Sequence, residues 1–309
     1  MNGLRAVVCG ITLIALAGCG ASETQSISTP VSLADSPPLI VENAGQSQFK
    51  RIAALASGSS DVLISLGLTQ NVVGVSATET RPELSAAPTI SPAHAVNIEQ
   101  ILVAEPDLIL LDEGSANAAE LEQLQSQGAE VLVLKPSFSA NEMFAKIRSI
   151  GSKLGLTREA EAIVTQLALP ANGNVEVRTK PRVAFLYLRG NNAIYLIGGT
   201  GSGADQLLDM AGAIDAGSEV LNDPFTPLSA ESIAKLNPDA LLVMTKGLES
   251  VGGISGLLAL PGVAQTSAGK QQQVIVVEDQ LLLSFSTRTP ALVEQLRARL
   301  KLLAPPASY

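Results

Sequence analysis

The side chains that could ligate a metal ion or act as nucleophiles are few in this sequence. The chain of 309 residues has one histidine, His94, and two cysteines, Cys9 and Cys19. One histidine cannot build a multi-histidine zinc site, and two cysteines cannot build a four-cysteine site. A serine hydrolase would need that histidine as its base, and the sequence has no Gly-x-Ser-x-Gly motif. These counts argue against most metalloenzymes and against serine hydrolases.

One glycine-rich phrase could bind a dinucleotide. Gly199-Thr-Gly201-Ser-Gly-Ala204 formally matches Gly-x-Gly-x-x-Ala, and Glu219 follows 20 residues after Gly199. Residues 215–227, however, contain no convincing strand that would end at this acid. A tight turn that begins a helix explains the phrase equally well, so a dinucleotide-binding enzyme is the lesser alternative and we expect a protein that is not an enzyme.

Composition narrows the class of protein further. Hydrophobic residues make up 46% of the chain and the mean hydropathy is +0.30, which is enough apolar material for a large core and excludes a disordered chain. The formal charge is −9, and the lysines and arginines do not cluster in any part of the sequence. We therefore expect no nucleic acid partner.

The N-terminus has the pattern of an exported lipoprotein. Arg5 precedes an apolar run of the length of a secretory signal, and this run ends in Leu16-Ala-Gly-Cys19, which looks like a bacterial lipobox. We therefore expect a signal peptide over residues 1–18, a lipidated Cys19 and a flexible tether over residues 19–48, rich in Ser, Thr, Pro and Ala. The plain alternative is an ordinary signal peptide with an incidental cysteine. The mature chain would have no cysteine pair for a disulfide.

The rest of the chain alternates short apolar segments with helical periodicity. Strands are predicted over residues 51–56, 72–75, 108–111, 131–134 and 183–188, and helices over 61–68, 98–104 and 118–127. This β-α rhythm predicts an α/β fold with mostly parallel sheets.

One phrase occurs twice, 132 residues apart. Asn97-Ile-Glu99 followed by Pro106-Asp107 parallels Ser229-Ala-Glu231 followed by Pro238-Asp239. Asn or Ser caps a short helix, Glu lies in its first turn, and Pro ends it before an apolar strand. The repeat predicts two related α/β lobes, residues 49–138 and 170–309. A long or kinked helix over residues 139–169 would join them.

At this point the sequence resembles a known family, the substrate-binding lipoproteins of bacterial ABC importers for haem, within the wider group that serves cobalamin and ferric siderophores. The likeness covers about residues 49–303. It is carried by Arg51-Ile-Ala-Ala-Leu55, Gly58-Ser-Ser-Asp-Val-Leu-Ile-Ser-Leu-Gly67, Glu99 with Pro106-Asp107, Gly199-Thr-Gly-Ser-Gly-Ala-Asp205 with Ala211-Gly212, Pro227-Leu-Ser-Ala-Glu231, Leu257-Leu-Ala-Leu-Pro-Gly262 and Leu282-Leu-Ser-Phe-Ser-Thr-Arg-Thr-Pro290.

The resemblance implies a lipid-anchored, exported protein that faces the periplasm or the outer surface and has no intrinsic cofactor. It would capture haem, the transported ligand, in a cleft between the two lobes and deliver it to a permease dimer. Glu99 and Glu231 match the acids that dock onto the permease in this family. A ferric siderophore or cobalamin is the alternative ligand.

The sequence departs from the family at the expected iron ligands. Arg81 stands where haem-binding members commonly have a tyrosine, and Arg189 stands near a second ligand position. A guanidinium does not ligate iron. Two interpretations follow. In the first, haem is still bound, with His94, Tyr187 or Tyr195 as the iron ligand or with no protein ligand. In the second, Arg81 and Arg189 face each other across the cleft and bind an anionic ligand.

Three further residues are weaker candidates for the cleft. Ser59 and Ser60 lie at a helix N-terminus, where backbone amides attract anions. Arg288 lies in the last loop and would either face the cleft or pair with an acid.

Overall fold

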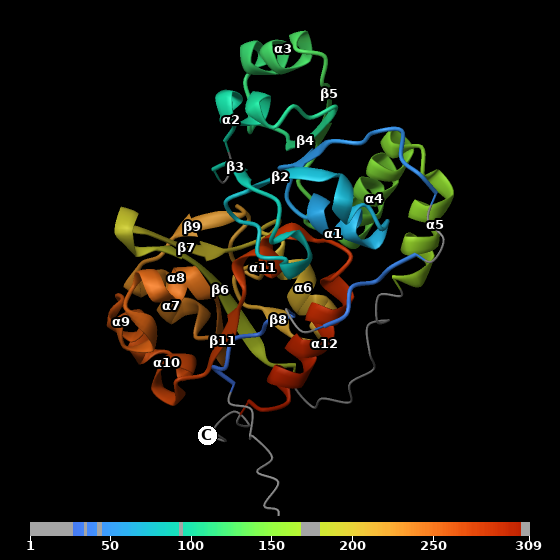
Figure 1. Ribbon diagram of the computed structural model, residues 1–309. Coiled ribbons are helices and arrows are strands. Elements are labelled where there is room, and N and C mark those ends of the chain that lie inside the picture. Colours follow the sequence, from blue (N-terminus) through green and yellow to red (C-terminus); the bar gives the residue numbers. More distant parts are fainter. Residues whose placement is uncertain (1–26, 34–35, 42–44, 93–94, 168–179, 304–309) are drawn as a thin grey trace, which may run out of the picture.

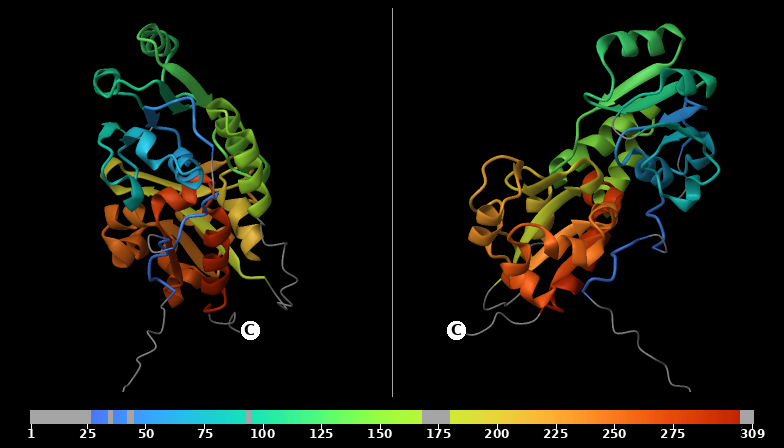
Figure 2. Two further views of the ribbon diagram at one scale, coloured as in Figure 1. Left: turned by 45° about the vertical axis from the view of Figure 1, so that its right-hand side comes forward. Right: turned by 90° about the vertical axis from the view of Figure 1, so that its left-hand side faces the viewer.

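The computed structural model describes residues 27–33, 36–41, 45–92, 95–167 and 180–303. The predicted signal peptide, Cys19 and His94 lie outside the described residues. Two lobes are stacked one above the other, the N-terminal lobe coloured blue to green and the C-terminal lobe yellow to red (Figures 1 and 2). No helix in the described ranges combines the length and the apolar character that crossing a bilayer requires.

The N-terminal lobe is built on a five-stranded parallel sheet. Its strand order is β3-β2-β1-β4-β5. The elements are β1 (Ile52–Ala54), α1 (Ser59–Ser65), β2 (Val72–Ser76), β3 (Thr89–Ser91), α2 (Ile98–Val103), β4 (Leu108–Asp112), α3 (Ala118–Ser126) and β5 (Glu130–Leu134), with short 3₁₀ turns at Thr69–Asn71 and Pro82–Leu84. β1 and β4 are buried along most of their length, which explains their almost continuous apolar sequence.

The C-terminal lobe has a mixed six-stranded sheet of order β11-β10-β6-β7-β9, with β8 beside β6. Its elements are β6 (Arg182–Arg189), β7 (Ile194–Gly198), α6 (Ala204–Ala211), β8 (Ile214–Asp215), β9 (Phe225–Pro227), α7 (Ala230–Leu236), β10 (Ala240–Met244), α8 (Thr245–Ser250), α9 (Gly253–Ala259), α10 (Ser267–Gln271), β11 (Val274–Val277), α11 (Asp279–Ser284) and α12 (Thr289–Leu300). β7 is antiparallel to β6 because the turn between them, Gly190–Asn192, is too short for a crossover.

In both lobes the repeated phrase caps a helix and places an aspartate that binds a backbone amide near a central strand. Asn97 Oδ1 accepts a hydrogen bond from the Gln100 amide at the start of α2, and Ser229 caps α7 in the same way. The Asp107 carboxylate accepts from the Arg51 amide at 3.0 Å, next to β1. The Asp239 carboxylate accepts from the Arg182 amide at 2.9 Å, at the start of β6. The two lobes therefore share one local construction, as the repeat predicts.

The predicted linking helix is two helices, α4 (Ala140–Leu154) and α5 (Thr157–Gln166). Gly155 ends α4 with φ of 76°, a left-handed conformation that glycine adopts without steric cost. Met143, Ile147, Ile150 and Leu154 are fully buried at helical spacing, so one face of α4 belongs to the core that both lobes share.

The described part of the expected tether is packed on both lobes, which corrects the prediction of a flexible segment. We call residues 27–33, 36–41 and 45–48 the N-terminal strap, and it appears in blue in Figure 1. Val31 forms a parallel bridge with Val277 of β11, and its side chain is 2% exposed. The amide of Val41 then donates to Ser65 O of α1 at 2.9 Å. The few apolar residues of the strap lack a periodic pattern, so sequence periodicity did not reveal their burial.

Candidate functional site

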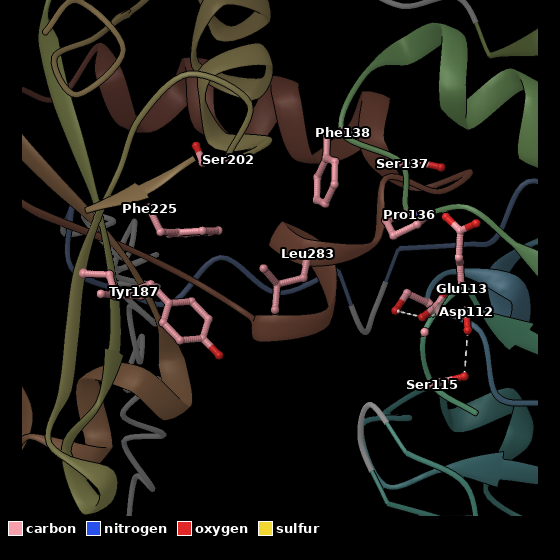
Figure 3. A pocket seen from close by; sticks show the side chains of 13 residues that line it. Asp112, Glu113, Ser115, Pro136, Ser137, Phe138, Tyr187, Ser202, Phe225 and Leu283 are labelled. Carbon is pink, nitrogen blue, oxygen red and sulfur yellow. Dashed lines mark hydrogen bonds between the residues drawn. The ribbon is translucent and has the colours of Figure 1, made fainter. Parts of the chain in front are cut away.

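A cavity of about 430 Å³ lies between the two lobes (Figure 3). It is lined by Ser57, Asp112, Glu113, Gly114, Ser115, Pro136, Ser137, Phe138, Tyr187, Leu196, Ser202, Phe225 and Leu283. In the N-terminal lobe these residues follow the carboxyl ends of β1, β4 and β5, where ligands bind in open α/β sheets. The volume lies within the range of about 300–1,000 Å³ that is usual for small-molecule sites.

The wall formed by the C-terminal lobe is apolar and aromatic. Tyr187 on β6 and Phe225 on β9 stack edge to face with ring centroids 5.7 Å apart. Figure 3 shows both rings, with Leu283 of α11, facing the same space as Phe138. Phe138 and Phe225 are 40% and 38% exposed, and large apolar side chains gathered at an open cavity mark a binding surface.

The opposite wall is acidic. Asp112 Oδ2 accepts hydrogen bonds from the Ser57 amide at 2.9 Å and from its hydroxyl at 2.6 Å. Asp112 Oδ1 is buried and has no hydrogen-bond partner among the described residues. Glu113 follows and is exposed. The cavity therefore places carboxylates opposite an aromatic face, which suits a ligand with a flat apolar body.

Tyr187 carries the only phenol on the described wall, and Arg189 lies beside it. The Arg189 guanidinium carbon is 4.5 Å from the centroid of the Tyr187 ring, a cation–π contact. Arg189 also donates to the carbonyl of Leu188 at 2.9 Å and lies 3.7 Å from the Asp279 carboxylate. Arg189 therefore lies over one face of the Tyr187 ring and is not among the residues that line the cavity.

Arg81 does not face the cleft, which corrects the expectation that it points across it toward Arg189. Its side chain is 4% exposed and forms a two-pronged ion pair with Glu83, with distances of 3.0 and 2.6 Å. It also lies 3.4 Å from Asp61, a buried carboxylate of α1. Glu83 is close along the chain and Asp61 is not, and together they leave no free guanidinium for a ligand.

Arg288 pairs with the same carboxylate. Its Nε lies 3.0 Å from Asp61 Oδ1, and the hydroxyl of Ser286 donates to Asp61 Oδ2 at 2.5 Å. Burial raises the pKa of Asp61, and the two arginines act in the opposite direction. Arg288 thus has the second of its two predicted roles, a pair with an acid, and this ion pair links the start of α12 to α1 of the N-terminal lobe.

Ser59 and Ser60 are buried in α1, with exposed fractions of 0% and 3%. The Ser59 hydroxyl donates to Ala56 O at 2.6 Å. Neither residue lines the interlobe cavity, so the structure does not bring them to the ligand.

Glu99 and Glu231 are exposed, each in the first turn of its capped helix. Neither forms an ion pair or hydrogen bond with any described residue. Helices α2 and α7 both lie on the left-hand side of the molecule in Figure 1, one on each lobe. The two acids are therefore available to a partner.

The glycine-rich phrase is a turn and not a dinucleotide site. It follows β7, which is antiparallel to its neighbours β6 and β9, whereas the fingerprint requires a parallel β-α-β unit. Glu219 forms an ion pair with Arg182 and does not end a strand. The Asp205 carboxylate accepts from the amides of Gly201 and Gly203, so the chain itself satisfies these donors.

Several lining residues escaped the sequence analysis. Asp112, Glu113 and Ser115 directly follow a predicted strand, so the rule that ligands bind at the carboxyl ends of parallel strands would have found them. Phe138, Phe225, Leu196 and Leu283 carried no such signal. They meet only through the folding of segments that are far apart in the sequence.

Comparisons with known proteins agree with this geometry. Residues 52–281 match the family described as periplasmic binding protein. The uncharacterized ABC transporter substrate-binding lipoprotein YvrC of Bacillus subtilis (strain 168) is 25% identical over 300 residues, which is 93% of each chain.

Solved haem-binding proteins share the fold. The periplasmic haem-binding protein RhuT from Roseiflexus sp. RS-1 is 31% identical with a TM-score of 0.77, over 84% of this chain and all of that one. The haem-binding protein HmuT is 28% identical with a TM-score of 0.74, over 89% of this chain and 95% of its own. Single alanine replacements of a histidine, of a tyrosine and of an arginine two positions after that tyrosine have been solved in HmuT.

Proposed function

Because the chain belongs to the periplasmic binding protein family, we propose that it captures haem in the interlobe cavity and delivers it to an ABC importer. The haem-binding relatives RhuT and HmuT support haem as the ligand. The protein would act as a carrier and would not change its cargo chemically.

One observation carries the proposal: a single phenol stands on an aromatic wall of the cavity. Tyr187, Phe225, Leu283 and Phe138 offer a broad apolar face to a flat macrocycle. The Tyr187 oxygen is the group on this wall that can ligate ferric iron. Arg189 follows two positions later and supports the ring, the same spacing as the tyrosine and arginine replaced in HmuT. We propose Tyr187 as the iron ligand and Arg189 as the residue that positions it.

His94 remains a candidate for a second iron ligand. It lies outside the described residues, in the segment between β3 and α2, and its role rests on the sequence alone.

The partner would be the permease of the importer. Glu99 and Glu231 are exposed and unpaired within the described structure, one on each lobe, as docking onto a two-fold symmetric partner requires. The relative YvrC is described as a lipoprotein, which supports an exported protein anchored through Cys19 and facing the periplasm or the outer surface.

A visible absorption titration with hemin tests the ligand. The native protein should show a saturable Soret shift at one equivalent, because one cavity accepts one macrocycle. Tyr187→Phe removes the ligating oxygen and keeps the ring, so the charge-transfer band of a tyrosine-ligated ferric haem should disappear and the affinity should fall about tenfold or more.

Tyr195→Phe is the matched control. Tyr195 lies on β7, packs against the other face of the sheet and does not line the cavity, so its loss should leave the spectrum unchanged. Identical spectra for Tyr187→Phe and the native protein would remove Tyr187 as the ligand. The absence of any shift in the native protein would overturn haem and favour a ferric siderophore or cobalamin.

A further inference from the structure

A second cavity lies between the N-terminal strap, the end of α5 and the start of α12. Its volume is about 350 Å³, and it shares no lining residue with the first. The N-terminal strap forms one wall, the end of α5 another, and the start of α12 the third. The lining residues are Leu33, Ser36, Pro37, Pro38, Leu39, Gln166, Leu167, Thr287, Arg288, Pro290 and Ala291.

One buried cation stands at this cavity. Arg288 is 7% exposed and lines it. Its Nη2 has no hydrogen-bond partner in the described structure. Its Nε lies 3.0 Å from Asp61 Oδ1, a carboxylate that Arg81 also contacts. None of the described lining residues is acidic. A buried guanidinium with an unsatisfied donor, beside a cavity whose described lining carries no carboxylate, favours an anionic ligand.

The start of α12 adds a second attraction for negative charge. This helix has twelve residues, and no side-chain hydrogen bond caps its N-terminus. Pro290 has no amide hydrogen, and the Ala291 amide has no hydrogen-bond partner among the described residues. Ala291 itself lines the cavity, so the positive end of the helix dipole and Arg288 lie at the same place.

Most of the remaining lining is apolar, and Ser36, Gln166 and Thr287 are the polar residues among the other described lining residues. Leu33 and Leu167 are buried, and Pro37, Pro38, Leu39 and Pro290 complete the apolar part of the lining. A simple inorganic anion would leave this surface in contact with water. A carboxylate attached to a short aliphatic chain satisfies both parts of the cavity.

We propose that this cavity is a second ligand site, which binds an aliphatic monocarboxylate with its carboxylate at Arg288 and the start of α12. The chain of the ligand would lie against the strap, so binding would hold the strap in place on α5 and α12.

Isothermal titration of the purified protein with octanoate tests the proposal. Octanol, which has the same chain and no charge, should bind about tenfold more weakly or worse, because a hydrogen bond to a charged group is worth about 1.5–3 kcal/mol. Acetate, which has the charge and almost no chain, should bind more weakly than octanoate. Equal binding of octanoate and octanol, or no binding of octanoate, would overturn the site.

Two variants of α12 locate the binding. Ala291→Phe fills the cavity without touching the ion pair of Arg288, and octanoate binding should be lost. Ala298→Phe is the matched control, since Ala298 is exposed on the same helix and does not line the cavity. If Ala291→Phe unfolds, Leu39→Trp fills the same cavity from the strap. Equal octanoate affinity in the filled and control variants would contradict the proposal.

The site is independent of haem capture. Octanoate should bind equally well to protein saturated with hemin, and Ala291→Phe should titrate with hemin as the native protein does. Competition between octanoate and hemin would place the carboxylate in the interlobe cavity and overturn the second site. A failure of hemin to bind would leave the octanoate result unaffected.

Discussion

Asp61 shows how one buried carboxylate can decide the role of two arginines. Arg81 and Arg288 both contact it, the first from the loop after β2 and the second from the start of α12. Removing one partner from a buried ion pair commonly costs about 3–5 kcal/mol, because the other charge remains without compensation. This cost explains why these two arginines, which the sequence offers as candidates for the interlobe cleft, are held at Asp61 and do not line the interlobe cavity.

Asp215 gives a pH dependence that can be measured. It is 5% exposed, and burial raises its pKa from 3.8 to about 6. The hydrogen bond that it accepts from the Gly217 amide acts in the opposite direction and lowers the pKa. The folded protein thus binds this proton more tightly than the unfolded chain does. The contribution of Asp215 to the free energy of unfolding should therefore fall as pH rises from about 4 to 6, by at most about 1.4 kcal/mol per pH unit. Above pH 6 this contribution should stay level.

Asp215→Asn removes this titration. Urea unfolding at several pH values should show the native protein losing stability relative to the variant between pH 4 and 6. Asp223→Asn, an exposed aspartate in the same lobe, should follow the native curve. Parallel curves for the native protein and Asp215→Asn would show that Asp215 does not carry the effect.

The contact between α4 and α5 depends on a small residue on each helix. A Cβ added at Gly151 would lie 2.2 Å from Cβ of Ala160 and 3.1 Å from Leu156 O. Gly155, which ends α4, has no atom within 4 Å of its missing Cβ and is needed only for its left-handed backbone. Close approach and backbone freedom are thus separate reasons for two glycines four residues apart.

Gly151→Ala should destabilise the protein. Alanine improves helix propensity by up to about 1 kcal/mol, but overpacking costs about 1–3 kcal/mol. Ala160→Gly returns the lost space, so the double variant should be more stable than the two single costs predict. Urea unfolding of the four proteins measures this coupling, and strictly additive free energies would contradict the steric argument.

The lobes are joined by more than the linking helices. Lys146 of α4 is 5% exposed and donates to Ser57 O of one lobe at 3.0 Å and to Ser284 O of the other at 3.3 Å. Burial lowers the pKa of this lysine. Together with the Asp61 cluster and the strap, it ties both lobes to one shared core. We therefore expect small hinge motions around the ligand and not wide closure.

The docking proposal is tested on the whole transporter. Glu99→Ala combined with Glu231→Ala should abolish haem uptake by cells while the purified variant titrates with hemin as before, because both acids are exposed and neither lines the cavity. Glu122→Ala with Glu249→Ala removes one exposed glutamate from each lobe and is the matched control. Normal uptake in the first double variant would refute docking through these acids.

Features that depend on residues close together along the chain could be predicted from the sequence. The caps at Asn97 and Ser229, the strand and helix order and the repeated lobe construction all follow from hydrophobic period and from hydrogen bonds across three residues. The family resemblance added the cleft between the lobes and the expected ligand.

Features that depend on packing between distant segments could not be predicted from the sequence. The burial of Arg81 and Arg288 around Asp61, the antiparallel β7 and the docking of the strap each join segments that the sequence keeps apart. A charged residue looks the same in a sequence whether its partner is water, a ligand or a buried carboxylate. Only the folded chain brings that partner to the charged residue, and the partner decides whether the residue stabilises the structure or binds a ligand.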